Sequence, residues 1–257
     1  MEQYLPHFHL RGKLAAVTGA TKGIGKAIST AFAEAGADVL LISRSESDLN
    51  RVKEELKQYG GNIYTISGDV QHYKAIIEKI EEKRIGASID IWVNNAGINI
   101  RSRAEEVTED EWEVIVNTNM KAAFFLTQYA AKQMKDKGYG KIINISSVAG
   151  HVALRTGVVY GMTKAALIQM TKTLALEWGK DGIRINAIGP WYFTTSLTEK
   201  LLKDEDYVNE IIHQTPLKRI GKLNELTGTA VFLASEASDY ITGQTIFVDG
   251  GMTIYGF

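Results

Sequence analysis

The chain has 257 residues, of which 45% are hydrophobic, and its 29 basic and 30 acidic side chains leave a net charge of −1. A chain of this length can bury a sizeable core, and its near-balanced charge gives no reason to expect nucleic acid or an anionic membrane as a partner. It contains no cysteine, which excludes disulfides, thiolate catalysis and zinc–thiolate sites.

The first residues lack a basic stretch followed by an apolar run, so they do not indicate a secretory signal. No apolar run in the chain approaches membrane-spanning length. We therefore expect a cytoplasmic protein with no membrane partner. The five histidines are scattered and form no His-Glu-x-x-His pattern, so we predict no metal site.

Short apolar runs alternate with helical patterns along the chain. The predicted strands are 13–19, 38–43, 62–68, 89–95, 140–146, 183–188 and 245–249, and the predicted helices are 23–35, 46–59, 71–84, 108–136, 157–179 and 223–235. This alternation favours a parallel sheet covered on both faces. We expect one Rossmann-type, doubly wound α/β domain over residues 1–257, with a seven-stranded parallel sheet. The long irregular segment 189–222 is predicted to be a substrate lid.

The first predicted strand leads into a glycine-rich turn and a helix, the opening unit of a dinucleotide fold. Gly19 lets the chain turn sharply, while Gly23 and Gly25 let the backbone approach a pyrophosphate at the positive end of the helix. The spacing is Gly-x-x-x-Gly-x-Gly, and on its own such a loop also fits a plain tight turn. The loop residues expected at the cofactor are Gly19, Thr21, Lys22, Gly23, Ile24 and Gly25.

The end of the second strand bears on the choice of cofactor. In dinucleotide folds an acid at this place bonds the ribose diol and disfavours a 2′-phosphate. Here the strand ends in Ser43-Arg44, and no carboxylate comes before Glu46. Arg44 can pair with a 2′-phosphate and Lys22 can add a second positive charge, although both also fit ordinary solvated cations. We expect NADP(H), with NAD(H) as the second choice.

Tyr160 and Lys164 stand four residues apart, one turn of a helix, and Ser147 comes thirteen residues before the tyrosine. A lysine ammonium favours the phenolate and so lowers the pKa of a neighbouring tyrosine from its ordinary value of about 10. With a serine hydroxyl on the same substrate oxygen, the three groups supply what reversible carbonyl reduction needs. Taken alone, the Tyr-x-x-x-Lys pair also fits a solvated helix face.

Five motifs occur in order: Thr18-Gly-Ala-Thr-Lys-Gly-Ile-Gly25, Asn94-Asn-Ala-Gly97, Ser147, Tyr160-x-x-x-Lys164 and Asn186-Ala-Ile-Gly-Pro190. In this combination the chain resembles the short-chain dehydrogenase/reductase family over essentially its whole length. The resemblance implies that the catalytic residues are Asn119, Ser147, Tyr160 and Lys164, with Asn119 positioning a water in a proton relay. Asn117 and Ser146 are the neighbouring alternatives that fit the family pattern less well.

The same resemblance extends the expected cofactor site. Asp69 is similar to the residue that bonds the adenine amino group, although it also fits a cap on the helix that begins near Gln71. Asn94 is expected to brace the sheet. Thr195 aligns by spacing with the threonine that bonds the nicotinamide carboxamide, and Thr194 is the alternative. The other residues implied at the cofactor are Ser43, Val70, Asn95, Ala96, Gly97, Tyr160, Lys164 and Pro190.

One position departs from the family pattern, which has Pro-Gly after the sixth strand. This chain has Pro190-Trp191-Tyr192, and tryptophan does not adopt positive φ as cheaply as glycine. The loop is therefore expected to differ locally, unless no glycine is needed there. The Pro-Trp-Tyr sequence resembles the tropinone-reductase-like branch, whereas Gly97-Ile-Asn and the region of Arg101 resemble gluconate 5-dehydrogenase-like members.

The resemblance implies an NADP(H)-dependent oxidoreductase that interconverts a small ketone and a secondary alcohol. A sugar-acid oxidoreductase and a 3-oxoacyl thioester reductase are alternatives of the same class, and a catalytically silent cofactor sensor is an alternative of another class. Substrate contacts are expected from Ser147, Arg101, His151, Trp191 and Tyr192, although His151 also fits a loop histidine and Arg101 a solvent-facing cation. The family further implies a homotetramer built from the fourth and fifth helices.

Overall fold

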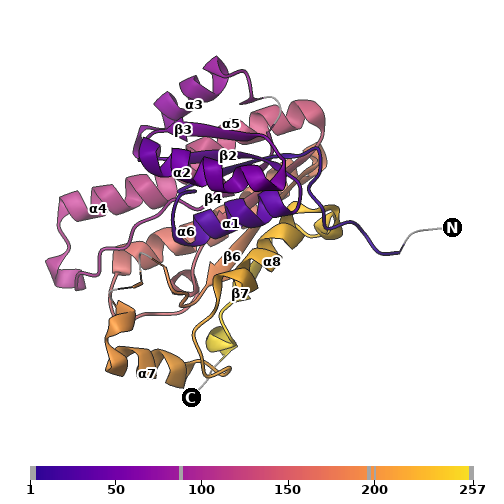
Figure 1. Cartoon of the computed structure of the whole chain (residues 1–257). Coiled ribbons are helices and arrows are strands. Elements are labelled where there is room, and N and C mark those ends of the chain that lie inside the picture. The colour runs from indigo at the N-terminus through magenta and orange to yellow at the C-terminus, as the bar shows by residue number, and fades with distance from the viewer. Residues whose placement is uncertain (1–3, 87–88, 196–197, 200, 255–257) are drawn as a thin grey trace.

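The structure is a computed structural model that describes residues 4–86, 89–195, 198–199 and 201–254. Its centre is a seven-stranded parallel sheet with the strand order β3-β2-β1-β4-β5-β6-β7 (Figure 1). This confirms the predicted fold class. The strands are β1 (Leu14–Thr18), β2 (Asp38–Ser43), β3 (Ile63–Ser67), β4 (Ile89–Asn94), β5 (Gly140–Ile145), β6 (Ile183–Pro190) and β7 (Thr245–Val248).

Helices cover both faces of the sheet (Figure 1). Side chains alternate between the faces along each strand. On β1, Ala15 and Val17 pack with α1, α2 and α8, whereas Leu14 and Ala16 pack with α3, α5 and α6. The helices are α1 (Gly23–Glu34), α2 (Glu46–Leu56), α3 (Tyr73–Glu82), α4 (Glu109–Val116), α5 (Ala122–Lys137), α6 (Val158–Trp178), α7 (Glu205–Gln214) and α8 (Leu223–Ala234).

A buried amide network ties the middle of the sheet to the helices behind it. The Asn94 amide donates to Thr127 Oγ1 at 2.6 Å and to Asn144 Oδ1 at 2.7 Å, and its oxygen accepts from Trp92 Nε1 at 2.8 Å. Buried polar groups need such partners, and here they are all supplied by side chains. The prediction that Asn94 braces the sheet is confirmed.

The helix predicted over 108–136 contains a π-helical segment, Asn117–Lys121, between α4 and α5. The start of α4 is capped, because Thr108 Oγ1 accepts from Glu111 N at 3.2 Å. The carboxylate of Glu111 accepts from Ser102 Oγ at 2.6 Å. The π segment is a local change of helical pitch that apolar periodicity does not reveal.

The prediction that 189–222 is irregular throughout is wrong, because α7 lies within it. Asp204 Oδ1 accepts from Tyr207 N at 3.1 Å and caps this helix, and Ile211 is its buried apolar residue. Figure 1 shows α7 apart from the helices that cover the sheet. Three residues of the expected lid segment, Ser196, Leu197 and Lys200, lie outside the described residues.

Candidate active site

A cleft runs along the carboxyl ends of the central strands, where parallel α/β folds bind their ligands. Most of the residues expected in the site line this cleft, and Asn119 and His151 are the two that do not. The lining residues that were expected are Gly19, Thr21, Lys22, Gly23, Ile24, Gly25, Ser43, Arg44, Asp69, Val70, Asn95, Ala96, Gly97, Arg101, Ser147, Tyr160, Lys164, Pro190, Trp191, Tyr192 and Thr195.

The glycine loop between β1 and α1 forms one end of the cleft. Gly19 and Gly23 have φ of 65° and 51°, in the left-handed region that favours glycine. A Cβ on Gly25 would lie 2.3 Å from the Gly19 carbonyl oxygen, so that position has no room for a side chain. The Asn95 amide donates to the carbonyl oxygens of Thr18 at 2.9 Å and Gly19 at 3.2 Å. Asn95 thus fixes the loop, a role that sequence reasoning missed.

Two cations stand beside the same end of the cleft. Lys22 Nζ lies 3.2 Å from Asp48 Oδ2, and Arg44 Nη1 lies 3.9 Å from Asp69 Oδ2. The Arg44 side chain is 76% exposed, and an exposed ion pair of this kind is worth only about 0–1 kcal/mol. Both cations can therefore exchange their partners for an anionic ligand. Asp69 also caps the next turn, since its Oδ1 accepts from Gln71 N at 2.9 Å.

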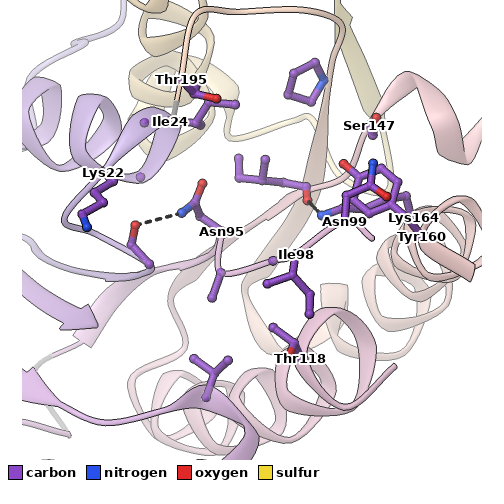
Figure 2. A pocket seen from close by; sticks show the side chains of 18 of the residues that line it. Lys22, Ile24, Asn95, Ile98, Asn99, Thr118, Ser147, Tyr160, Lys164 and Thr195 are labelled. Atoms are coloured by element: carbon purple, nitrogen blue, oxygen red, sulfur yellow. Dashed lines mark hydrogen bonds between the residues drawn. The ribbon is translucent and has the colours of Figure 1, made fainter. Parts of the chain in front are cut away.

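Ser147, Tyr160 and Lys164 meet at the other end of the cleft, as Figure 2 shows. Ser147 follows β5, while Tyr160 and Lys164 project from the same face of α6. Lys164 Nζ lies 5.4 Å from the centre of the Tyr160 ring and donates to the Ile145 carbonyl oxygen at 2.8 Å. The Ser147 hydroxyl lies near enough to Tyr160 to favour its phenolate.

Burial governs the pKa values of the two titratable residues. It raises the pKa of Tyr160, and the opposing, smaller influences are the nearby Ser147 hydroxyl and the charge of Arg101. The expectation that Lys164 lowers the pKa of Tyr160 is therefore not met. Burial also lowers the pKa of Lys164 to about 8, because an ammonium loses its hydration in the protein interior.

Asn119 is buried one layer behind the cleft. Its amide accepts from Ile98 N and donates to Ile98 O, both at 2.9 Å, and donates to Thr163 Oγ1 at 3.2 Å. A Cβ on Gly97 would lie 3.3 Å from Asn119 Oδ1 and 3.4 Å from Lys164 Nζ. The amide and the ammonium thus flank Gly97. The competing residue, Asn117, donates to Glu113 Oε2 at 2.9 Å on an exposed part of the helix.

Arg101 joins the aromatic wall at the catalytic end of the cleft. Its Nη1 donates to the hydroxyls of Tyr192 at 3.3 Å and Tyr207 at 3.2 Å, and these hydroxyls lie 2.5 Å apart. Burial is the main cause that raises the pKa of Tyr192 to about 12.

Arg155 pairs with Glu210 and lies 5.7 Å from the centre of the Tyr207 ring. Sequence reasoning missed Tyr207 because it missed α7, whose signal was Asp204 before apolar residues at helical spacing.

The expectation for His151 needs correction, whereas the alternative left open for Trp191 is borne out. His151 is exposed and packs on Phe247, with ring centres 5.0 Å apart, whereas Leu154 lines the cleft instead. Among the described residues, a positive φ at a non-glycine position occurs at Arg84 and Lys218 and not at Trp191. The loop after β6 therefore needs no glycine at 191. The indole Nε1 of Trp191 donates to Thr215 Oγ1 at 3.1 Å.

The fold and the site together define a dinucleotide-dependent oxidoreductase. A family model described as enoyl-(acyl carrier protein) reductase matches residues 19–253. Over 252 residues the chain is 42% identical to a tropinone reductase homologue of Arabidopsis thaliana, covering 96% of this chain and 95% of the relative. The chain belongs to the short-chain dehydrogenase/reductase family and is one of its oxidoreductases.

Proteins named as gluconate 5-dehydrogenases are nearly as similar. A gluconate 5-dehydrogenase of Gluconobacter oxydans is 40% identical over 250 residues, covering 96% of this chain and 97% of the relative. A crystal structure of a gluconate 5-dehydrogenase from Burkholderia cenocepacia, in complex with NADP and tartrate, superimposes with a TM-score of 0.92. Its sequence is 37% identical, and the match covers 98% of this chain and 99% of that one.

Proposed function

We propose that this chain is an NADP(H)-dependent oxidoreductase that interconverts a ketone and a secondary alcohol, with Tyr160 as the general acid and base. The observation that carries the proposal is that Ser147, Tyr160 and Lys164 line the same cleft as the glycine loop and Arg44. One cleft thus offers a phosphate cradle at one end and a proton donor at the other. The experiment is a spectrophotometric screen of ketones, oxoacyl thioesters and hexonates with both nicotinamide cofactors.

The residues present fit a phosphorylated dinucleotide. The backbone around Gly25 carries no side chain, and it lies at the amino end of α1, where N–H groups can bind a pyrophosphate. Arg44 and Lys22 would hold a 2′-phosphate, and β2 ends in Ser43 rather than an acid. The solved relative with bound NADP supports the same choice. When bound, NADPH supplies the hydride.

Residues of the chain would then donate the proton and carry its replacement to the site. Ser147 would hold the substrate oxygen, because its hydroxyl lies at the same end of the cleft as Tyr160 and near enough to act on that phenol. The raised pKa of Tyr160 keeps the phenol protonated and ready to donate to that oxygen during reduction. Lys164 is held by the Ile145 carbonyl and flanks Gly97 opposite Asn119, which suits a proton path that leads from Tyr160 through Lys164.

A polyhydroxylated acid is the candidate substrate that Arg101 favours over a plain ketone. The guanidinium is half-buried, and its hydrogen bonds within the described part of the chain go to the phenols of Tyr192 and Tyr207 and not to a carboxylate. A substrate carboxylate would supply the missing opposite charge. Arg101→Ala should then cost roughly 1.5–3 kcal/mol on an oxo acid and little on a neutral ketone. A larger loss from Trp191→Ala on neutral ketones would instead favour the plain ketone.

The assembly, the lid and the location of the protein are part of the proposal. We infer a homotetramer through the fourth and fifth predicted helices, which correspond to α4 with α5 and to α6, supported by the exposure of Trp112 at 40% and Phe124 at 37%. Light scattering of wild type and Trp112→Glu tests this, and a monomeric wild type contradicts it.

Segment 189–222 acts as the substrate lid, and the protein works in the cytoplasm. No helix in the described part of the chain is long and apolar enough to cross a membrane.

A further inference from the structure

Asn99 carries a buried hydrogen-bond acceptor that has no partner. Its Oδ1 atom is shielded from solvent and makes no hydrogen bond, although the residue lines the cleft. Figure 2 shows Asn99 at the end of the pocket that holds Ser147 and Tyr160. Folded proteins seldom leave such a group unsatisfied, because its desolvation is then uncompensated. Because Oδ1 is closed to water in this structure, a donor on the substrate reaches it only after a small movement of the cleft wall, and the unpaired acceptor calls for such a donor.

The backbone beneath Asn99 is fixed on both sides. The N–H and C=O of the preceding residue, Ile98, are both bonded to the Asn119 amide at 2.9 Å. On the other side Gly157, at the amino end of α6, donates from its N–H to Ser102 O at 3.4 Å. A Cβ on Gly157 would lie 3.0 Å from Asn99 Oδ1. The acceptor is thus held against the turn that leads into Tyr160.

The charge around this acceptor selects the kind of donor. Arg101 lines the same cleft, and its positive charge slightly favours the phenolate of Tyr160 and so acts in the direction that lowers that residue's pKa. A substrate ammonium would meet this permanent positive charge and be repelled. A hydroxyl is a neutral donor and meets no such repulsion. The acceptor therefore suits a hydroxylated substrate rather than an amine.

We propose that Asn99 is a specificity-determining residue that accepts a hydrogen bond from a substrate hydroxyl, so that the enzyme prefers hydroxylated oxo acids to their deoxy analogues. The inference rests on the proposed function and deepens it. Arg101 would recognise the carboxylate, whereas Asn99 would recognise a hydroxyl nearer the reacting carbonyl. Loss of the amide should therefore change the choice between substrates and not only the overall rate.

A matched pair of ketones tests this. 5-Oxogluconate and 5-oxohexanoate share a carbon skeleton, and only the first carries hydroxyls. With NADPH, the ratio of kcat/KM for 5-oxogluconate to that for 5-oxohexanoate should fall roughly tenfold in Asn99→Leu, which keeps the branched shape without the acceptor. Asn99→Ala serves if leucine is not tolerated. Asn224→Leu, on the exposed first turn of α8, is the control and should keep the wild-type ratio.

A binding measurement accompanies the kinetics. Calorimetric titration of D-gluconate in the presence of NADPH, a pair that cannot react, should show a dissociation constant raised roughly tenfold by the Asn99 variants. A wild-type ratio and wild-type affinity in these variants would overturn the inference. Wild-type reduction of 5-oxohexanoate but not of 5-oxogluconate would also overturn it while leaving the proposed function intact. Reduction of neither ketone would overturn the inference, and the proposed function would fall with it only if the wider substrate screen also found no turnover.

Discussion

Replacing Gly25 by alanine should weaken NADPH binding and destabilise the fold for a purely steric reason. Gly25 lies in α1 and its φ is not in the left-handed region, so the alanine backbone itself is allowed. The added Cβ would lie 2.3 Å from both the Gly19 carbonyl oxygen and Asn95 Nδ2, about 1 Å short of ordinary van der Waals contact. The loop must then move, and it cannot keep the two bonds from Asn95 that fix it.

The size of the effect follows from those contacts. Overpacking of this kind costs roughly 1–3 kcal/mol of the free energy of unfolding. Losing one well-placed hydrogen bond to a phosphate costs about 1.5–3 kcal/mol, which is roughly tenfold or more in the dissociation constant of NADPH. Chemical denaturation and a fluorescence titration with NADPH measure the two quantities.

Gly228→Ala in α8 is the matched control. A Cβ on Gly228 would meet nothing within 4 Å, and alanine is a better helix former than glycine by about 0.8–1 kcal/mol. This variant should be slightly more stable than wild type and should bind NADPH normally. Wild-type stability and affinity in Gly25→Ala would refute the reasoning, because the loop would then have room for a side chain.

Tyr160→Phe should lower kcat by roughly 10²–10⁴-fold and leave NADPH affinity intact, since only the phenolic proton donor is removed; near-normal turnover would exclude Tyr160 as the acid. Arg44→Asp should shift kcat/KM from NADPH towards NADH, because a carboxylate repels the 2′-phosphate and accepts from the ribose diol; a wild type that already prefers NADH would contradict the cofactor assignment. Lys164→Met should be inactive yet more stable than wild type at pH 7, by up to about 3 kcal/mol. The folded-state pKa of Lys164, about 8, is below its ordinary value, so burying its ammonium destabilises the folded protein. This loss in the free energy of unfolding is full below pH 8 and disappears as pH rises towards 10.5. A stability difference that does not change between pH 7 and pH 10 would rule this out.

The sequence by itself determined the strands, the order of the motifs and most of the cleft. Each strand is a short apolar run that can satisfy its backbone only by pairing, so local periodicity was enough to place it. The glycine loop and the spacing of Tyr160 and Lys164 are local as well, since they depend on the turn and on one helix. Because the carboxyl ends of parallel strands meet at one edge of the sheet, these segments come together once the fold is known.

Only the tertiary structure decided how the site residues act on one another. The burial that raises the pKa of Tyr160 comes from segments far apart in the chain, and the pairing of Arg101 with Tyr192 and Tyr207 joins three of them. The same holds for Asn95, whose bonds to the glycine loop span 76 and 77 residues. His151 follows Ser147 closely in sequence but turns away from the cleft to pack on Phe247. Solvent exclusion and long-range contacts depend on which surfaces meet, and no local pattern records that.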